Sequence, residues 1–166
     1  MQSKNVTPEQ ILLLLSALFA MLIVMSNLIS QKFVDINFLY LYKVELSAGT
    51  LTYPFTFIIS DLIAEFYGKE EARSCVRLGI IISICVALMI YLIGLLDATS
   101  WSTIDNTLFD KAYGHYSAVL VGSLIASFVS QNLDIYLYLT LRRLTNGRFL
   151  WIRSNVSTLI SLFVDS

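Results

Sequence analysis

Two carboxylates interrupt an otherwise apolar stretch in the first half of the chain. In the run TYPFTFIISDLIAEFYGKEEAR, residues 52–73, Asp61 and Glu65 stand four positions apart. Residues at that spacing lie on one face of a helix. A charged side chain at the centre of a membrane costs about 2.5–3.5 kcal/mol on insertion scales, so such residues commonly line a binding site or a transport path. The spacing therefore predicts a polar surface that faces a cavity inside a helical bundle.

A second polar stripe follows a later apolar segment. Its members recur at spacings of three and four: Ser123, Ser127, Ser130, Gln131, Asp134 and Tyr138. Two further polar groups lie in the first apolar segment and at the C-terminal end of the chain: Asn27, and the set Ser154, Thr158, Ser161 and Asp165. These spacings predict that several helices present polar faces to one shared interior.

Structural roles compete with a binding role at several of these positions. Four hydroxyl side chains would equally serve to join helices, at about 0.6 kcal/mol for each hydrogen bond: Ser123, Ser127, Thr158 and Ser161. Glu65 would also pair with Lys69 one helical turn later. Asp61, Gln131 and Asp134 are harder to explain by helix packing alone.

The sequence carries no recognisable enzyme motif. It has no GxSxG, no HExxH and no glycine-rich phosphate loop, and its single histidine has no metal-ligand set around it. Asp61 and Asp134 on facing helices would suit an intramembrane aspartyl protease, but the glycine-rich flank usual in those enzymes is missing. We therefore expect a protein that is not an enzyme and that uses no cofactor or metal.

Composition indicates a membrane protein. Of 166 residues, 57% are hydrophobic and only 14% are charged, and the mean hydropathy is +0.73. An ordinary soluble domain is roughly 45–50% apolar. The formal net charge of -1 gives no reason to expect nucleic acid as a partner.

Four segments are long enough to cross a bilayer, which needs about 20 helical residues: Ile11–Ile29, Ala48–Phe66, Leu78–Leu96 and Ser117–Leu141. A fifth apolar stretch, from Asn155 to Ser166, is too short to span, so we expect the chain to stop inside a helix. The predicted fold is an all-α, multi-pass membrane bundle in which residues 1–166 form one transmembrane domain, with four complete helices and an incomplete fifth. Thr7 or Asn5 would cap the first helix, and residues 34–46 alternate in a way that suits a short external hairpin.

Positive charges are unequally divided between the two sides of this bundle. One side holds Lys4, Lys69, Arg73, Arg77, Arg142, Arg143, Arg148 and Arg153, and the other holds Lys32, Lys43 and Lys111. Because the side richer in Lys and Arg faces the cytoplasm, the N-terminus is predicted to be cytoplasmic.

Three runs of the sequence resemble a known family. These are GTLTYPFTFIISDLIAEFYGKEEAR at residues 49–73, SQNLDIYLYLTLRR at 130–143 and GRFLWIRSNVSTLISLFVDS at 147–166. They are similar to the queuosine precursor transporter family, also called the vitamin uptake transporter family, and the likeness covers most of the chain from Asn27 onward. The resemblance implies a multi-pass protein of the bacterial inner membrane that imports a 7-deazaguanine, either the 7-cyano or 7-aminomethyl precursor or queuine, for tRNA modification.

The chemistry of such a ligand suggests roles for the polar residues. Asp61, Glu65 or Asp134 would accept the N–H donors of a guanine-like edge in a two-pronged manner. Gln131 and Asn27 would read its carbonyl and ring nitrogens. Its flat face would stack on one of three aromatic side chains: Tyr53, Phe55 or Phe57. Asp165 lies on the polar face of the last helix and completes the predicted set.

Other functions remain open at this stage. Members of the family continue beyond the position of Asp165, so the chain resembles a C-terminally truncated member, a disrupted gene product or a protein completed by homo-oligomerisation. Protonation of a buried acid would couple an importer to the proton gradient. The sequence is also compatible with a substrate-binding membrane subunit for a vitamin-like or purine-like solute. Such a subunit would need an energising partner, for which the Arg142–Arg153 loop would be the docking surface. A remnant or scaffold that does not transport is the third alternative.

Overall fold

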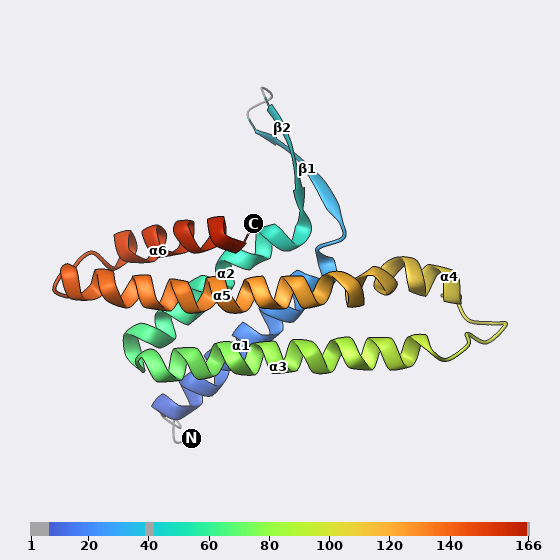
Figure 1. Cartoon of the computed structure of the whole chain (residues 1–166), viewed down its shortest axis with the longest axis horizontal. Coiled ribbons are helices and arrows are strands. Elements are labelled where there is room, and N and C mark those ends of the chain that lie inside the picture. The colour runs from blue at the N-terminus through green and yellow to red at the C-terminus, as the bar shows by residue number, and fades with distance from the viewer. Residues whose placement is uncertain (1–6, 39–41, 166) are drawn as a thin grey trace, which may run out of the picture.

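The structure, a computed structural model, describes residues 7–38 and 42–165, apart from the side chains at 37, 38, 42, 115–121 and 165. Its elements in chain order are α1 (Pro8–Ile29), β1 (Phe33–Phe38), β2 (Tyr42–Ser47), α2 (Ala48–Phe66), α3 (Lys69–Gly94), α4 (Asn106–Phe109), a π-helical turn (Asp110–Gly114), α5 (His115–Leu144) and α6 (Leu150–Asp165). The fold is thus mostly helical, as the sequence predicts, with one hairpin projecting from the bundle (Figure 1).

The first helix begins with the predicted cap. The Thr7 hydroxyl accepts a hydrogen bond from the Gln10 backbone over 3.4 Å, and the Gln10 side chain accepts one from the Thr7 backbone over 3.1 Å. Pro8 occupies the first turn, where its missing N–H costs nothing. This reciprocal capping box satisfies donors that a helix start leaves unpaired.

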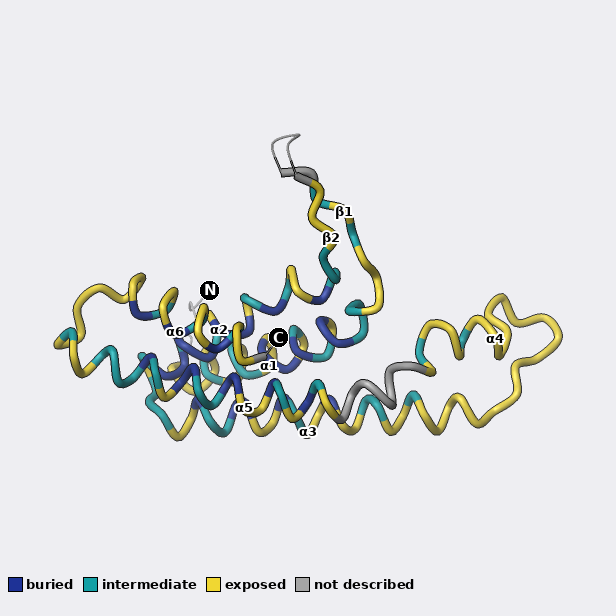
Figure 2. Tube along the Cα trace, turned by 45° about the horizontal axis from the view of Figure 1, so that its top comes forward, coloured by how far each residue is buried: buried dark blue, intermediate teal, exposed yellow. Residues whose placement is uncertain are grey.

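The predicted hairpin is confirmed. β1 and β2 pair antiparallel, with Phe33 opposite Ser47. At the base of the hairpin the Ala48 N–H donates to the Lys32 carbonyl over 2.7 Å, which places the start of α2 beside the end of α1. Figure 2 shows the described part of the hairpin as intermediate or exposed, whereas burial concentrates where the long helices cross.

Two glycines allow the helices to approach closely. A Cβ at Gly79 of α3 would collide with the Phe19 ring of α1, and a Cβ at Gly49 of α2 would collide with the Ser26 carbonyl. The apolar core forms around this junction from Phe19, Ile23, Phe57, Ile63 and Ile135. α5 and α6 then run side by side in opposite directions, joined by a turn in which Asn146 and Gly147 have positive φ.

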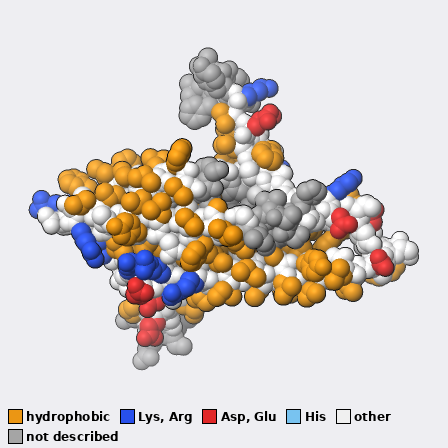
Figure 3. Space-filling model, viewed as in Figure 1, with side chains coloured by type: hydrophobic (Ala, Val, Ile, Leu, Met, Phe, Trp, Pro, Cys, Tyr) orange, Lys and Arg blue, Asp and Glu red, His pale blue; other side chains and the backbone are white. Residues whose placement is uncertain are grey.

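The outer surface of the bundle suits contact with lipid. Among the described residues, α1 and α3 are the two helices whose length and apolar composition fit a membrane crossing. Large apolar side chains such as Leu13, Met89 and Leu96 are more than half exposed. Figure 3 shows apolar side chains along the helices and charged side chains gathered toward their ends. A water-soluble protein rarely exposes so much contiguous apolar surface.

The helix boundaries agree only partly with the predicted spans. The predicted span Ala48–Phe66 coincides with α2, but α3 begins at Lys69 rather than Leu78, and α6 begins at Leu150 rather than Asn155. Apolarity locates the part of a helix that lies in lipid, whereas good helix formers such as Lys and Glu extend the helix beyond it. The short α4 was not predicted. Its cap is Asp105, whose pKa is lowered by hydrogen bonds from the Leu108 backbone and the Thr107 side chain.

Candidate functional site

The polar face of α2 points into the bundle. Thr56, Ser60 and Asp61 are all buried, because they share the helix face that packs on α5 and α6. Ser154 of α6 donates to Oδ2 of Asp61 over 2.5 Å. The other oxygen, Oδ1, is buried and has no hydrogen-bond partner among the described residues. Asp61 therefore retains an acceptor that is available to a ligand.

A side-chain amide bridges α5 to α2 beside this carboxyl. The Nε2 atom of Gln131 donates to Thr56 Oγ1 over 2.8 Å, and Ser60 donates to Gln131 Oε1 over 3.3 Å. Gln131 is fully buried. These two bonds fix the orientation of the amide and the position of α5 against α2.

Asp134 is fully buried, like Gln131 on the same helix. It is 0% exposed, and neither carboxylate oxygen has a hydrogen-bond partner of normal geometry among the described residues. Asp61 faces it from α2, and a group of hydroxyls faces it from α6: Ser157, Thr158 and Ser161. Two acids from different helices thus lie together in one buried cluster, as the sequence pattern predicts.

Glu65 lies one helical turn after Asp61 on α2, where it meets arginines from α5 and α6. It accepts a hydrogen bond from the Tyr138 hydroxyl over 2.8 Å. Its carboxylate also pairs with Arg142 over 3.3 Å and with Arg153 over 3.5 Å. Among the ion pairs of the described residues, Glu65 therefore takes two distant arginines rather than Lys69, so the alternative based on that neighbour is wrong.

Sequence reasoning missed the two arginines as members of the site. Arg153 is only 1% exposed, and its guanidinium lies 5.2 Å from the centre of the Tyr138 ring. The sequence places both arginines in the connection between helices, where they predict the topology and a docking surface for a partner. The spacing of Arg153, Ser157 and Ser161 by four was the available signal, because it places all three on one face of a helix.

A cavity of about 350 Å³ lies near the start of α2, at the other end of that helix from Glu65. Asn27, Tyr53 and Ser123 are among the residues that line it. The Ser123 hydroxyl donates to Oδ1 of Asn27 over 3.0 Å, while the Nδ2 atom of Asn27 is buried without a partner among the described residues. Tyr53 donates to Ser127 over 2.5 Å and so connects α2 to α5 below the cavity.

The aromatic residues of the predicted site separate into different environments. Phe57 is fully buried in the apolar core, and its ring packs edge-on against Tyr53 at 5.5 Å. Phe55 is 55% exposed on the outer side of α2. Residues two positions apart along a helix point about 200° away from each other, so residues 55 and 57 cannot share a face. The structure thus brings Tyr53 and Phe57 to the interior and leaves Phe55 outside.

The predicted residues form a track along α2 rather than a single cluster. Asn27 and Tyr53 border the cavity, Gln131 lies next, Asp61 and Asp134 share the buried pocket, and Glu65 is held by arginines at the far end. The side chain of Asp165 lies outside the described part of the chain. An acceptor-rich interior of this kind can receive a polar solute that carries several N–H donors.

Comparison with known proteins identifies the family of the chain. Residues 47–166 match the vitamin uptake transporter family. The chain is also 32% identical over 127 residues to a Bacillus subtilis (strain 168) protein named "Probable queuosine precursor transporter". That alignment covers 76% of this chain and 55% of the relative, so the chain spans little more than half the length of that protein. No solved structure matches the chain.

Proposed function

The chain belongs to the vitamin uptake transporter family, and from that premise we propose that it imports a queuosine precursor across the bacterial inner membrane. The proposed solute is a 7-deazaguanine used for tRNA modification, as the name of the Bacillus subtilis relative suggests. Membership of a transporter family favours a transport role over an enzymatic one. The buried Asp61–Asp134 pair, with acceptor oxygens that no described residue satisfies, carries the proposal.

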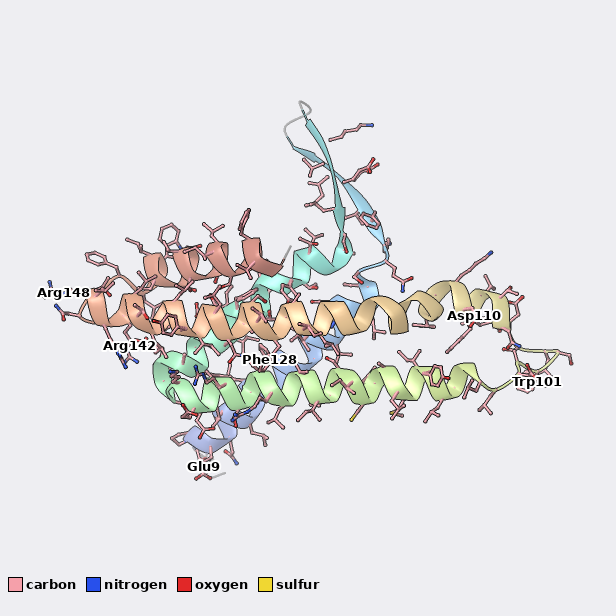
Figure 4. All side chains as sticks on the ribbon, in the orientation of Figure 1. Glu9, Trp101, Asp110, Phe128, Arg142 and Arg148 are labelled. Atoms are coloured by element: carbon pink, nitrogen blue, oxygen red, sulfur yellow. The ribbon has the colours of Figure 1, made fainter. Side chains whose placement is uncertain are left out.

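In our proposal α1, α2, α3 and α5 cross the membrane, α6 lies beside them, and residues 1–166 act as one transmembrane domain. α2 and α5 are less apolar than α1 and α3, but their most polar side chains, Gln131 and Asp134 among them, are buried in the bundle. Figure 4 labels Arg142 and Arg148 at one end of the molecule and Trp101 and Asp110 at the other. The arginine end and the N-terminus would face the cytoplasm.

The ligand chemistry fits the buried carboxyls. A guanine-like ring presents a ring N–H and an exocyclic amine side by side, which a carboxylate accepts as a two-pronged, charge-assisted pair of hydrogen bonds. Oδ1 of Asp61 and the oxygens of Asp134 are the acceptors that make no hydrogen bond of normal geometry with a described residue. Gln131 would read the ligand carbonyl from the wall of the same pocket, while Asn27 and Tyr53 would meet the ligand first in the cavity.

Transport would proceed along the track from the cavity to the arginine end. Opposite sides would open in turn as helices rock about the buried pocket, a scheme common to secondary transporters. At the inner end the Glu65 carboxylate and the guanidinium of Arg153 close the path, and these groups must separate before the ligand is released.

A substrate-binding subunit that depends on an energising partner is the second function to weigh. The arginine-rich loop would be its docking surface, but Arg142 and Arg153 turn inward to Glu65. Arg143 and Arg148 remain exposed and would have to carry the contact. This placement favours a transporter that works without such a partner.

The test is the queuosine content of tRNA in cells that cannot synthesise the precursor and receive it from the medium. Cells expressing the chain should regain queuosine, and cells expressing Asp61→Asn should not. Restoration that disappears when a nucleotide-hydrolysing partner is deleted would favour the subunit alternative. No restoration by the intact chain would contradict import.

A further inference from the structure

Buried polar atoms without partners concentrate in one pocket of the structure. Five of these atoms are oxygens: Oδ1 of Asp61, both carboxylate oxygens of Asp134, Oγ1 of Thr158 and Oγ of Ser161. They come from α2, α5 and α6, which contact one another in the bundle. A buried polar group without a partner costs about 1–3 kcal/mol, and more when it is charged. Such a concentration indicates a bound group.

The charges around the pocket do not balance. Three carboxylates, those of Asp61, Asp134 and Glu65, face two guanidinium groups, those of Arg142 and Arg153. With all of them ionised, one negative charge remains within the described part of the site. A single positive charge neutralises it, whereas a divalent ion would leave an excess positive charge. Buried charges require such compensation.

We propose that Asp134, Thr158 and Ser161, with the Asp61 carboxyl facing them, form a binding site for one sodium ion. All the unpartnered acceptors are carboxylate or hydroxyl oxygens, which are the ligands that hard cations prefer. A proton on one of the two carboxyls would also neutralise the charge, and absence of sodium binding to the folded chain would favour that alternative. Water would hydrogen-bond to the hydroxyls but would not neutralise the charge. A monovalent metal ion both neutralises the charge and takes the hydroxyl oxygens as ligands.

The position of the site gives it a role in transport, and this part of the inference rests on the proposed function. Both carboxyls lie deep in the track, where secondary transporters hold substrate and coupling ion together. A cation held between Asp134 and the hydroxyls of α6 leaves Oδ1 of Asp61 to accept the ligand. Sodium would then favour binding of the precursor, and the precursor would favour binding of sodium by the same factor.

Direct binding of radioactive sodium to the purified chain in detergent tests the site without any precursor. Ionic strength is held constant with choline chloride. We expect saturable binding that unlabelled sodium displaces and choline does not. Thr158→Val and Ser161→Ala each remove one ligand and should weaken binding about tenfold, and Asp134→Asn should abolish it. Ser83→Ala is the control, because Ser83 is buried in α3 and bonds only to its own helix at Gly79.

The outcomes separate this inference from the proposed function. Absence of saturable sodium binding to the folded wild-type chain overturns the site, and so does unchanged binding in Thr158→Val and Ser161→Ala. Sodium binding without any precursor uptake would keep the site and reject the transport function. Precursor uptake by a chain that binds no sodium would keep the transport function and reject the sodium site.

Discussion

Gln131 of α5 donates a 2.8 Å hydrogen bond to Thr56 of α2 at the centre of the bundle. This contact lies less than one turn before Asp134 on α5 and little more than one turn before Asp61 on α2. It therefore holds the two helices in the register that makes the carboxyls face each other. The amide carries no charge, so it positions the pair without competing for its ligands.

Thr56→Val should destabilise the chain by about 1–3 kcal/mol, because the substitution keeps the shape but leaves the buried Gln131 amide without its acceptor. Thermal unfolding in detergent measures the loss. Thr140→Val is the matched control, since the Thr140 hydroxyl donates only within its own helix, to the Tyr136 carbonyl. Equal effects of the two substitutions would show that the contact between helices contributes nothing.

Asp61→Asn and Asp134→Asn should each reduce precursor affinity by about tenfold to a hundredfold, the range for hydrogen bonds to a charged group. Both substitutions preserve size, so a change in affinity reports the charge. Initial uptake rates over a range of precursor concentrations give the affinity. Asp35→Asn, in the exposed hairpin, should leave it unchanged. Wild-type affinity in both interior variants would remove these residues from the site.

Glu65→Gln should cost about 3–5 kcal/mol of stability, because it leaves the buried guanidinium of Arg153 without its countercharge. Combining it with Arg153→Met should restore part of that loss, since the double variant has no uncompensated charge at this pair. Unfolding midpoints of the single and double variants give the comparison. Additive losses in the double variant would refute the coupling. Arg143→Met, at an exposed position, is the control.

Gly79→Ala should destabilise the contact between α1 and α3 by about 1–3 kcal/mol, because the added methyl group meets the Phe19 ring. Gly122→Ala is the matched control, since nothing lies within 4 Å of the position that its Cβ would take. The control should be neutral or slightly stabilising, as alanine suits a helix better than glycine. Retention of monomer in detergent after heating measures both. Equal behaviour would mean that the helices do not pack as described.

Local patterns predicted the elements and the direction of their polar faces. The polar spacing on α5 correctly placed Gln131, Asp134 and Tyr138 in the interior, because period alone decides which residues share a helix face. The span Ala48–Phe66 matched α2 because a hairpin precedes it and Gly68, with φ of 95°, follows its end. These features depend on neighbours in the sequence.

Contacts between distant segments were beyond such patterns. The pairing of Glu65 with Arg153 joins residues 88 positions apart, and no local rule selects it over the neighbouring Lys69. The exposure of Phe55 was predictable from its angle to Phe57, but aromatic character alone offered Phe55 as an alternative to Tyr53 and Phe57 for stacking on the ligand. The hydroxyls that α6 brings to Asp134 also depend on the turn that reverses the chain after α5.

The central claim is that the buried carboxyls receive the N–H edge of the ligand, and a comparison of two ligands tests it most directly. The Kd of 7-cyano-7-deazaguanine is measured beside that of the analogue without the exocyclic amine, for the wild type and for Asp61→Asn. The account predicts that the wild type discriminates by about tenfold or more and that Asp61→Asn loses most of this discrimination. Equal affinities of the wild type for both ligands, or full discrimination by Asp61→Asn, would contradict it.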